Sequence, residues 1–415
     1  MRCTRTFRSA GIAVLVLLSL WAALSGGIVL DRLVFAKLPL SGNTPASPNF
    51  NLINEAWQII AKEYVERQDI QPQKLTYGAI DGMVNALGDT GHSTFLSADM
   101  VPLAKHYLEG SFTGVGIEIR MKEGHIVIVA PIEGSPAQKA GLRPGDTVLK
   151  VDEKDIIGLP LDEVVKRITG QPGTAVSLTI LSPKTGQTRQ VSLVRAPITV
   201  NNATWTRMPD STFADIHIAG FSTGVADDLR KTLTEVRKEK ISGAILDLRD
   251  NPGGVFEAAV DATSQFLSGG NVALVKNNRG VTKEIPVVSG GAATDMKLVI
   301  LINGGTASAA EIMAGALQDA HRGKLLGEKT FGTGTVLEPF KLSDGSELLL
   351  AIAEWLTPDG RVIWHKGIAP DIELPLPAGV DPLYPQEMRG MSMRQIRERG
   401  DVQLMKALDL LNAPG

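Results

Sequence analysis

Ser308 is the residue of this chain whose position best suits a nucleophile. The apolar run 296–303 predicts a buried strand, and Gly304-Gly-Thr-Ala-Ser308 leads from it into a predicted helix over 308–319. Negative charge is favoured at a helix N-terminus, so chemistry that develops charge on an oxygen suits this position. A serine hydroxyl is nevertheless a weak nucleophile until a base takes its proton. The alternative role is a helix N-cap, which is frequent for serine.

A glycine pair after a second predicted strand could supply hydrogen-bond donors for the same chemistry. The buried strand 241–248 runs into Arg249-Asp-Asn-Pro-Gly-Gly254. Backbone N–H groups aimed at a developing oxyanion stabilise the transition state by about 2.7–4 kcal/mol for one donor. For a bare Gly-Gly pair the alternative is a turn that only caps the strand.

These segments resemble the active-site motifs of the carboxyl-terminal processing peptidases, the tail-specific serine proteases of peptidase family S41. The matching stretches are the 248–254 turn, Thr306-Ala-Ser-Ala-Ala-Glu-Ile312 and Gly327-Glu-Lys-Thr-Phe-Gly-Thr-Gly-Thr-Val-Leu337. The resemblance implies that Ser308 is the nucleophile. It also implies an oxyanion hole in which the amide of Gly253 or Gly254 joins that of Ala309.

The position of the family's general base is changed in this chain. The family motif reads Thr-Phe-Gly-Lys-Gly-x-Val-Gln, and its lysine falls on Thr333 while its glutamine falls on Leu337. Threonine has no basic nitrogen, and leucine has no amide oxygen to orient an ammonium group. We therefore expect a small apolar contact in place of a polar relay. Losing one member of such a cooperating pair costs on the order of 10⁴ to 10⁶ in rate.

A glycine-rich region ahead of the core resembles a PDZ domain. Its signatures are Gly114-Val-Gly-Ile-Glu-Ile119 and the stretch from Gly134-Ser-Pro to Arg143-Pro-Gly-Asp146. Backbone N–H groups of Gly114, Val115, Gly116 and Ile117 would form a nest for a terminal carboxylate, and the following strand edge would pair with the peptide. The predicted helix 161–169 would form the other wall of the groove. A β-bulge is the alternative for a bare glycine pair.

The N-terminus predicts a membrane or export segment. Arg2, Arg5 and Arg8 precede an uncharged run over 11–30, which is about the length that a helix needs to cross a bilayer. Arginines ahead of the run favour an orientation that places the remainder outside the cytoplasm. A retained anchor is the favoured interpretation, and a cleaved signal peptide is the alternative. Both interpretations place the functional domains in a bacterial-type cell envelope or in the secreted fraction.

Composition excludes several classes of function. The net charge of −3 over 415 residues provides no basic surface for nucleic acid. The single cysteine, Cys3, rules out a disulfide framework. No CxxC or HExxH motif predicts a metal, and no cofactor motif is found. The expected partners are proteins or peptides with free C-termini and, through the N-terminal segment, a membrane. A second copy of the chain and an active peptidase both stay open as further partners.

The predicted fold class is mixed α/β (α+β) in several domains. From the resemblance, the peptidase core is expected to be of the crotonase-like ββα type. The predicted divisions are 1–36 (anchor or signal segment), 37–108 (linker and helical segment), 109–198 (PDZ domain), 199–376 (peptidase core) and 377–415 (helical tail).

Two functions are consistent with these residues. In the first, the chain recognises protein C-termini through its PDZ domain while hydrolysis by Ser308 is impaired. In the second, it is an active extracytoplasmic serine endopeptidase that uses an unconventional base or a water relay. Lys329 and His321 are the nearest basic residues in the sequence, and no geometric reason selects either of them.

Overall fold

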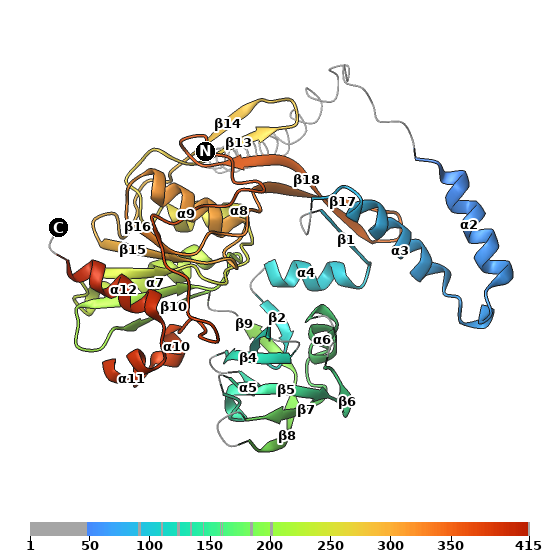
Figure 1. Cartoon of the computed structure of the whole chain (residues 1–415), viewed down its shortest axis with the longest axis horizontal. Coiled ribbons are helices and arrows are strands. Elements are labelled where there is room, and N and C mark those ends of the chain that lie inside the picture. The colour runs from blue at the N-terminus through green and yellow to red at the C-terminus, as the bar shows by residue number, and fades with distance from the viewer. Residues whose placement is uncertain are drawn as a thin grey trace, which may run out of the picture. The chain divides into compact units, whose positions relative to one another are not determined.

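Strands and helices alternate along most of the chain (Figure 1). Contacts divide the chain into two units, with the division after Pro72. A computed structural model describes residues 48–89, 93–108, 111–122, 125–132, 135–143, 145–157, 159, 161–182, 186–199 and 202–413.

The described part of the first unit consists of helix α2 (Phe50–Glu63) and the short 3-10 helix η1 (Arg67–Asp69). Asn49 caps α2, because its side-chain oxygen accepts a hydrogen bond from the Leu52 N–H at 3.3 Å. No residue of α2 is buried within this unit.

The second unit contains a six-stranded sheet in the order β10-β11-β12-β15-β16-β19. Strand β10 runs antiparallel to β11, and all other neighbours in this sheet are parallel. Parallel strands need cover on both faces, which explains why the inner strands are almost continuously apolar. The strands are β10 (Ala203–Arg207), β11 (Phe213–Ile218), β12 (Gly243–Asp247), β15 (Lys297–Ile302), β16 (Lys324–Gly327) and β19 (Ile372–Glu373).

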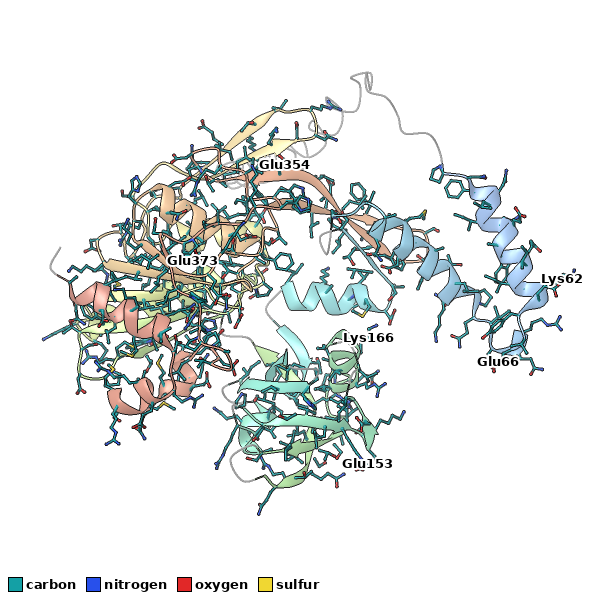
Figure 2. All side chains as sticks on the ribbon, viewed as in Figure 1. Lys62, Glu66, Glu153, Lys166, Glu354 and Glu373 are labelled. Carbon is teal, nitrogen blue, oxygen red and sulfur yellow. The ribbon has the colours of Figure 1, made fainter. Side chains whose placement is uncertain are left out.

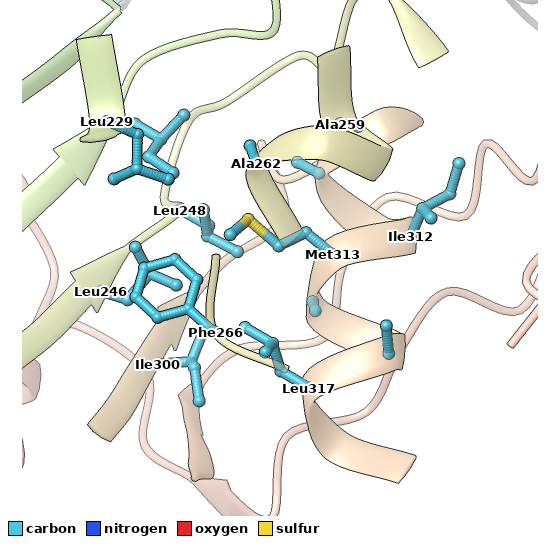
Figure 3. Close-up of a cluster of buried hydrophobic side chains, with 14 of the residues drawn as sticks. Leu229, Leu246, Leu248, Ala259, Ala262, Phe266, Ile300, Ile312, Met313 and Leu317 are labelled. Carbon is cyan, nitrogen blue, oxygen red and sulfur yellow. The ribbon is translucent and has the colours of Figure 1, made fainter. Parts of the chain in front are cut away.

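Helices cover both faces of this sheet. Successive strand residues point to opposite faces, so Leu246 packs in the cluster that includes Met313 (Figure 3), whereas Ile245 packs in the cluster that includes Leu408. The helices whose residues join the first cluster are α7 (Val225–Lys238), α8 (Phe256–Thr263) and α9 (Ala309–Asp319). Those whose residues join the second are α10 (Pro385–Met388), α11 (Met393–Glu398) and α12 (Val402–Asn412).

A second sheet of five strands includes the hairpin that begins just after Thr333. Its long hairpin pairs β17 with β18, and β18 also pairs with β1 and β13. The bounds are β1 (Thr94–Leu96), β13 (Asn271–Asn277), β14 (Thr282–Pro286), β17 (Thr335–Lys341) and β18 (Glu347–Leu356). Helix α3 (Pro72–Asn85) contacts the hairpin turn, where the Tyr77 hydroxyl donates to Asp344 at 2.8 Å. The backbone at the end of helix α4 (Met100–Leu108) accepts a hydrogen bond from Thr223 N–H at 2.8 Å.

The third sheet belongs to the region that resembles a PDZ domain. Its order is β3-β4-β5-β7-β8, so β3 is an edge strand, and its core includes Ile128, Val164 and Leu178. The strands of this sheet are β3 (Ile117–Lys122), β4 (His125–Pro131), β5 (Thr147–Val151), β6 (Lys154–Asp155, paired with β5), β7 (Ala175–Leu181) and β8 (Thr188–Val194). Strands β2 (Ser111–Gly114) and β9 (Ala196–Thr199) pair with each other in a separate two-stranded sheet. Two helices, α5 (Pro136–Lys139) and α6 (Leu161–Ile168), complete this region. Figure 2 shows charged side chains such as Glu153 and Glu373 on the outside.

The mixed α/β organisation expected from the sequence is confirmed. The predicted helix 308–319 is α9, which begins one residue later and leaves Ser308 just ahead of the helix. The predicted membrane segment over 11–30 lies outside the described residues. Within the part of the chain that the structure describes, no helix has the length and apolarity to cross a membrane.

Candidate active site

Ser308 occupies a strained turn between β15 and α9. Its backbone angles are φ 52° and ψ −119°, a conformation that non-glycine residues rarely adopt. Such a residue costs about 1–3 kcal/mol and persists only where its surroundings hold it in place. The Ser308 N–H is held by two acceptors, Glu311 Oε2 at 2.9 Å and Thr333 Oγ1 at 2.5 Å. The turn is therefore held by one residue of helix α9, Glu311, and by Thr333, which precedes strand β17.

The glycine turn, Asp250–Gly254, follows β12 and lies beside the Ser308 turn. Asn251 stabilises it, because its amide nitrogen donates to the Ile218 carbonyl at 2.7 Å and its side-chain oxygen accepts from Gly253 N–H at 2.9 Å. The Asn251 carbonyl accepts a hydrogen bond from Ala307 N–H at 2.9 Å. This last bond joins the glycine turn directly to the residue before Ser308.

Gly253 packs directly against the Ser308 turn. A Cβ added to Gly253 would lie 2.8 Å from Ser308 Cβ and 2.8 Å from the Ala309 nitrogen. Its φ of +94° adds a second reason for glycine at this position. At Gly254, a Cβ would lie 2.4 Å from the Phe221 carbonyl oxygen. Glycine at both positions is therefore a condition for bringing the turn against Ser308 and Ala309.

The backbone N–H groups of Gly253 and Gly254 differ in whether they already donate a hydrogen bond. The Gly253 N–H is already donated to Asn251. For the N–H groups of Gly254 and Ala309, no acceptor is found among the described residues. Of the two glycines that the sequence offered as oxyanion donors, Gly254 is thus the one whose amide stays available beside Ala309.

Thr333 is buried, and it hydrogen-bonds polar groups instead of forming an apolar contact. Its hydroxyl accepts from the Ser308 N–H and donates to Glu311 Oε2 at 2.8 Å. Leu337 lies apart from this network, in strand β17, with 40% of its surface exposed. The expectation of a small apolar contact between these two residues is therefore wrong. The physical reason is that the carboxylate of Glu311 imposes a polar environment on the 333 position.

Glu311 was not identified from the sequence, although it organises this part of the site. Its carboxylate is fully buried and accepts five hydrogen bonds. The donors are the N–H groups of Ser308, Gly332 and Thr333 and the hydroxyls of Thr330 and Thr333. The spacing Ser-x-x-Glu, typical of a helix capping box, is the sequence signal that could have revealed it.

The basic residues nearest in sequence lie outside this network. Lys329 and His321 are both exposed. Among the described residues, no amino or imidazole group forms a hydrogen bond with Ser308. The geometry thus brings Ser308, Ala309, Gly253 and Thr333 together, but it adds no basic group to them.

Buried ionisable groups lie behind the glycine turn, on the α12 face of the sheet. Burial, followed by the charge of Asp247, raises the pKa of Asp215 well above its usual value. Burial lowers the pKa of His217, whose ring stacks on Tyr384 with 4.2 Å between centroids. Burial and the neighbouring Asp250 raise the pKa of Tyr384. His217 is therefore neutral at pH 7, and the raised pKa of Asp215 favours its protonated form.

The glycine loop of the third sheet has its carbonyl groups engaged inside the domain. The Val115 carbonyl accepts from Ala137 N–H at 2.9 Å, and the Gly116 carbonyl accepts from Ile132 N–H at 2.9 Å and from the Ser135 hydroxyl at 3.0 Å. Gly116 has φ +75°, and a Cβ there would lie 2.3 Å from Ser135 Cβ. The loop from Gly114 leads directly into the edge strand β3, which begins at Ile117.

Three sequence profiles match successive parts of the chain. The N-terminal domain profile of the activating protease CtpB matches residues 37–99, a PDZ domain profile matches 127–182, and the profile of peptidase family S41 matches 212–374. The last range includes Ser308, Thr333 and the glycine turn.

Whole-chain comparisons agree with these matches. The carboxy-terminal processing protease CtpA of Bacillus subtilis (strain 168) is 37% identical over 329 residues, which cover 79% of this chain and 69% of that protein. A probable CtpA-like serine protease of Staphylococcus epidermidis (strain ATCC 12228 / FDA PCI 1200) is 35% identical over 367 residues, covering 88% and 73%. The solved photosystem II D1 C-terminal processing protease has 30% identity and a TM-score of 0.52, covering 81% of this chain and 95% of that one. The chain therefore belongs to peptidase family S41, the family of the carboxy-terminal processing proteases, and it carries a PDZ domain.

Proposed function

We propose that this S41 homologue captures protein C-termini through its PDZ domain and that hydrolysis by Ser308 is severely impaired. The single observation that supports impairment is that the hydrogen-bonding groups of Thr333 and Glu311 are already engaged. Thr333 stands where the family resemblance implies a base, and Glu311 is the carboxylate that accepts the Ser308 N–H.

Neither group is suited to take the Ser308 proton. The Thr333 hydroxyl has no basic nitrogen, and its own proton is directed at Glu311. A carboxylate has about four lone-pair positions, and Glu311 already accepts five hydrogen bonds. A proton arriving from Ser308 would have to displace one of these donors. Because removing one member of a catalytic pair costs on the order of 10⁴ to 10⁶ in rate, we expect hydrolysis to be slow or absent.

The alternative is an active endopeptidase with an unconventional base, such as a water relay. One observation favours it: the Ser308 turn is held in its strained conformation, and the Gly254 and Ala309 amides have no acceptor among the described residues. A chain that only binds peptides does not need these features. The two functions therefore differ in whether Ser308 is reactive.

Reactivity of Ser308 is tested directly by a serine-directed fluorophosphonate probe on the full-length chain, with Ser308→Ala as the control. We expect little or no labelling that depends on Ser308, because no group is placed to take its proton. Robust labelling that disappears in Ser308→Ala would favour the active endopeptidase.

Tail capture is supported by the glycine loop and the open edge of the third sheet. The carbonyl groups of Val115 and Gly116 are engaged within the domain, and β3 is the edge strand onto which an extended peptide could add. We infer that the substrates are proteins or peptides with free C-termini. From the arginines and the apolar run at the N-terminus, we infer a location outside the cytoplasm.

Carboxylate capture predicts a specific dependence on the peptide terminus. Amidating the C-terminus of a bound peptide should abolish binding, because the N–H nest would then lack its anionic partner. Isothermal titration of matched free-acid and amide peptides measures this. Equal affinities for the two peptides would contradict carboxylate capture.

A further inference from the structure

We infer that the C-terminal segment positions the glycine turn, with Asp401 and Tyr384 as its positioning residues. The role of that turn in catalysis rests on the proposed function, whereas its contacts with the C-terminal segment do not. The connection consists of two contacts, one at Arg249 and one at Asp250, which follow strand β12 and Leu248.

The first contact fixes Arg249, whose side chain is completely buried. On one side its guanidinium donates to both oxygens of Asp247, at 2.6–3.0 Å. On the other side it donates to both oxygens of Asp401, at 2.9 and 3.1 Å, and to the side-chain oxygen of Gln403 at 3.1 Å. Paired bonds of this kind fix direction as well as distance. Asp401, which caps α12, and Gln403 within it thus hold the Arg249 side chain, one residue ahead of the glycine turn.

Asp401 also connects two parts of the C-terminal segment to Arg249. Its carboxylate caps α12 by accepting the Leu404 N–H at 2.9 Å, and it accepts the Leu383 N–H at 3.0 Å. One buried carboxylate therefore joins the helix, the segment leading to α10 and Arg249. A displacement of α12 would act on Arg249 without an intervening flexible element.

The second contact is a hydrogen bond from the Tyr384 hydroxyl to Asp250 Oδ2 at 2.7 Å. The other oxygen of Asp250 accepts from the Asn303 amide at 2.8 Å, and Asp250 N–H donates to the Asn303 side-chain oxygen at 2.9 Å. Asn303 follows β15, the strand that leads to Ser308. Tyr384 thus acts on the residue that joins the two turns.

The conformation of the turn explains why it needs external support. Asp250 has φ +57°, and Gly253 and Gly254 have φ +94° and +140°. Asp250 is not a glycine, so its conformation persists only when the surroundings over-determine it, whereas the two glycines adopt their angles without strain. The alternative is that the cluster only stabilises the fold, since buried ion pairs are often structural. The two roles predict different effects of removing the contact: a positioning role loosens the two turns alone, whereas a stabilising role loosens the whole sheet.

Hydrogen–deuterium exchange of the full-length chain separates the two roles, with Tyr384→Phe as the main variant. This change keeps the ring against His217 and removes the hydroxyl, which donates to Asp250 at 2.7 Å and lies 3.5 Å from the Arg249 carbonyl oxygen. We expect exchange of the peptides covering 249–256 and 303–308 to accelerate by about tenfold or more, equivalent to about 1.4 kcal/mol. Strands β11 and β15 should keep their protection, and the Tm should change little.

Tyr77→Phe is the matched control, because Tyr77 also donates to a carboxylate, that of Asp344, at 2.8 Å. It should leave the exchange of both turns unchanged. Combining Tyr384→Phe with Asp250→Ala, which removes the acceptor of the Tyr384 hydroxyl, should accelerate exchange no further than Asp250→Ala alone.

Two outcomes would overturn the inference. One is unchanged exchange of both turns in Tyr384→Phe. The other is acceleration spread evenly over the sheet, which indicates a stabilising role alone. Asp401→Asn, compared with the exposed Asp409→Asn on the same helix, provides an independent second variant. Exchange does not require hydrolysis, so failure of the proposed function leaves this test intact.

Discussion

The two halves of the candidate active site differ in what they retain. The nucleophile half, which consists of Ser308, Ala309 and the glycine turn, has a strained serine beside backbone amides that lack an acceptor among the described residues. The proton-acceptor half, which consists of Thr333 and Glu311, has every polar group engaged with another. A shared hydrogen bond from Ser308 N–H holds the halves together. The difference teaches that a serine turn can be held in a strained conformation while the carboxylate beside it is already occupied by other donors.

The largest expected effect comes from restoring the proton-acceptor half. Thr333→Lys combined with Leu337→Gln should raise cleavage of an unfolded protein with a free C-terminus by about 10²–10⁴, the usual contribution of general acid–base catalysis. Gel-based cleavage assays measure the gain. The same pair of changes in a Ser308→Ala chain is the control. A folded double variant that cleaves no faster than the starting chain would show that the nucleophile half is also defective.

A smaller effect is expected from Glu311→Gln. The amide offers one oxygen in place of two, so some of the five buried donors lose their acceptor, at a cost of about 1–3 kcal/mol each. Urea unfolding should show a lower free energy of unfolding than in Glu257→Gln, a change at an exposed position of α8. The variant also sharpens the comparison of the two halves. If the starting chain is labelled by fluorophosphonate and Glu311→Gln abolishes that labelling in a folded protein, Glu311 is the missing base.

The smallest effect is expected behind the glycine turn, at Asp215. Neither of its carboxyl oxygens has a hydrogen-bond partner among the described residues, and its pKa is raised well above 3.8, chiefly by burial. A raised folded-state pKa means that the folded chain binds the proton more tightly than the unfolded chain. The contribution of Asp215 to stability is therefore present below pH 3.8 and is lost as the pH rises towards the folded pKa.

Asp215→Asn should remove this part of the pH dependence and raise the Tm at pH 7 by a few degrees, because the amide mimics the neutral carboxyl. Thermal unfolding across a pH series, with the exposed Asp409→Asn as control, measures the change. A lower Tm at pH 7 would indicate that the charged form of Asp215 supports the turn.

Much of the fold was predictable from local patterns. The apolar run before Ser308 became β15, and the amphipathic stretch after Gly224 became α7. Such patterns report which face of an element is buried, so they identify an element before its partners are known. The glycine turn was also predictable, because only glycine adopts the backbone angles of Gly253 and Gly254 without strain.

The environment of Thr333 was not predictable in the same way. The change of residue type was visible, but its neighbours were not, since Glu311 approaches from 22 residues away. An apolar contact was expected, and a polar one was found. The roles of Asp401 and Tyr384 gave no sequence signal, because their partners Arg249 and Asp250 lie more than a hundred residues away.

The sequence by itself determined the family, the order of the elements and the threonine at position 333, because each of these is encoded in residues that are close together. Only the tertiary structure decided which amides remain available and which acceptors are already occupied. It also decided which distant side chains hold the glycine turn. The physical reason is that hydrogen-bond saturation depends on every group within about 3 Å of an atom, and the chain folds those groups together from separate strands and helices.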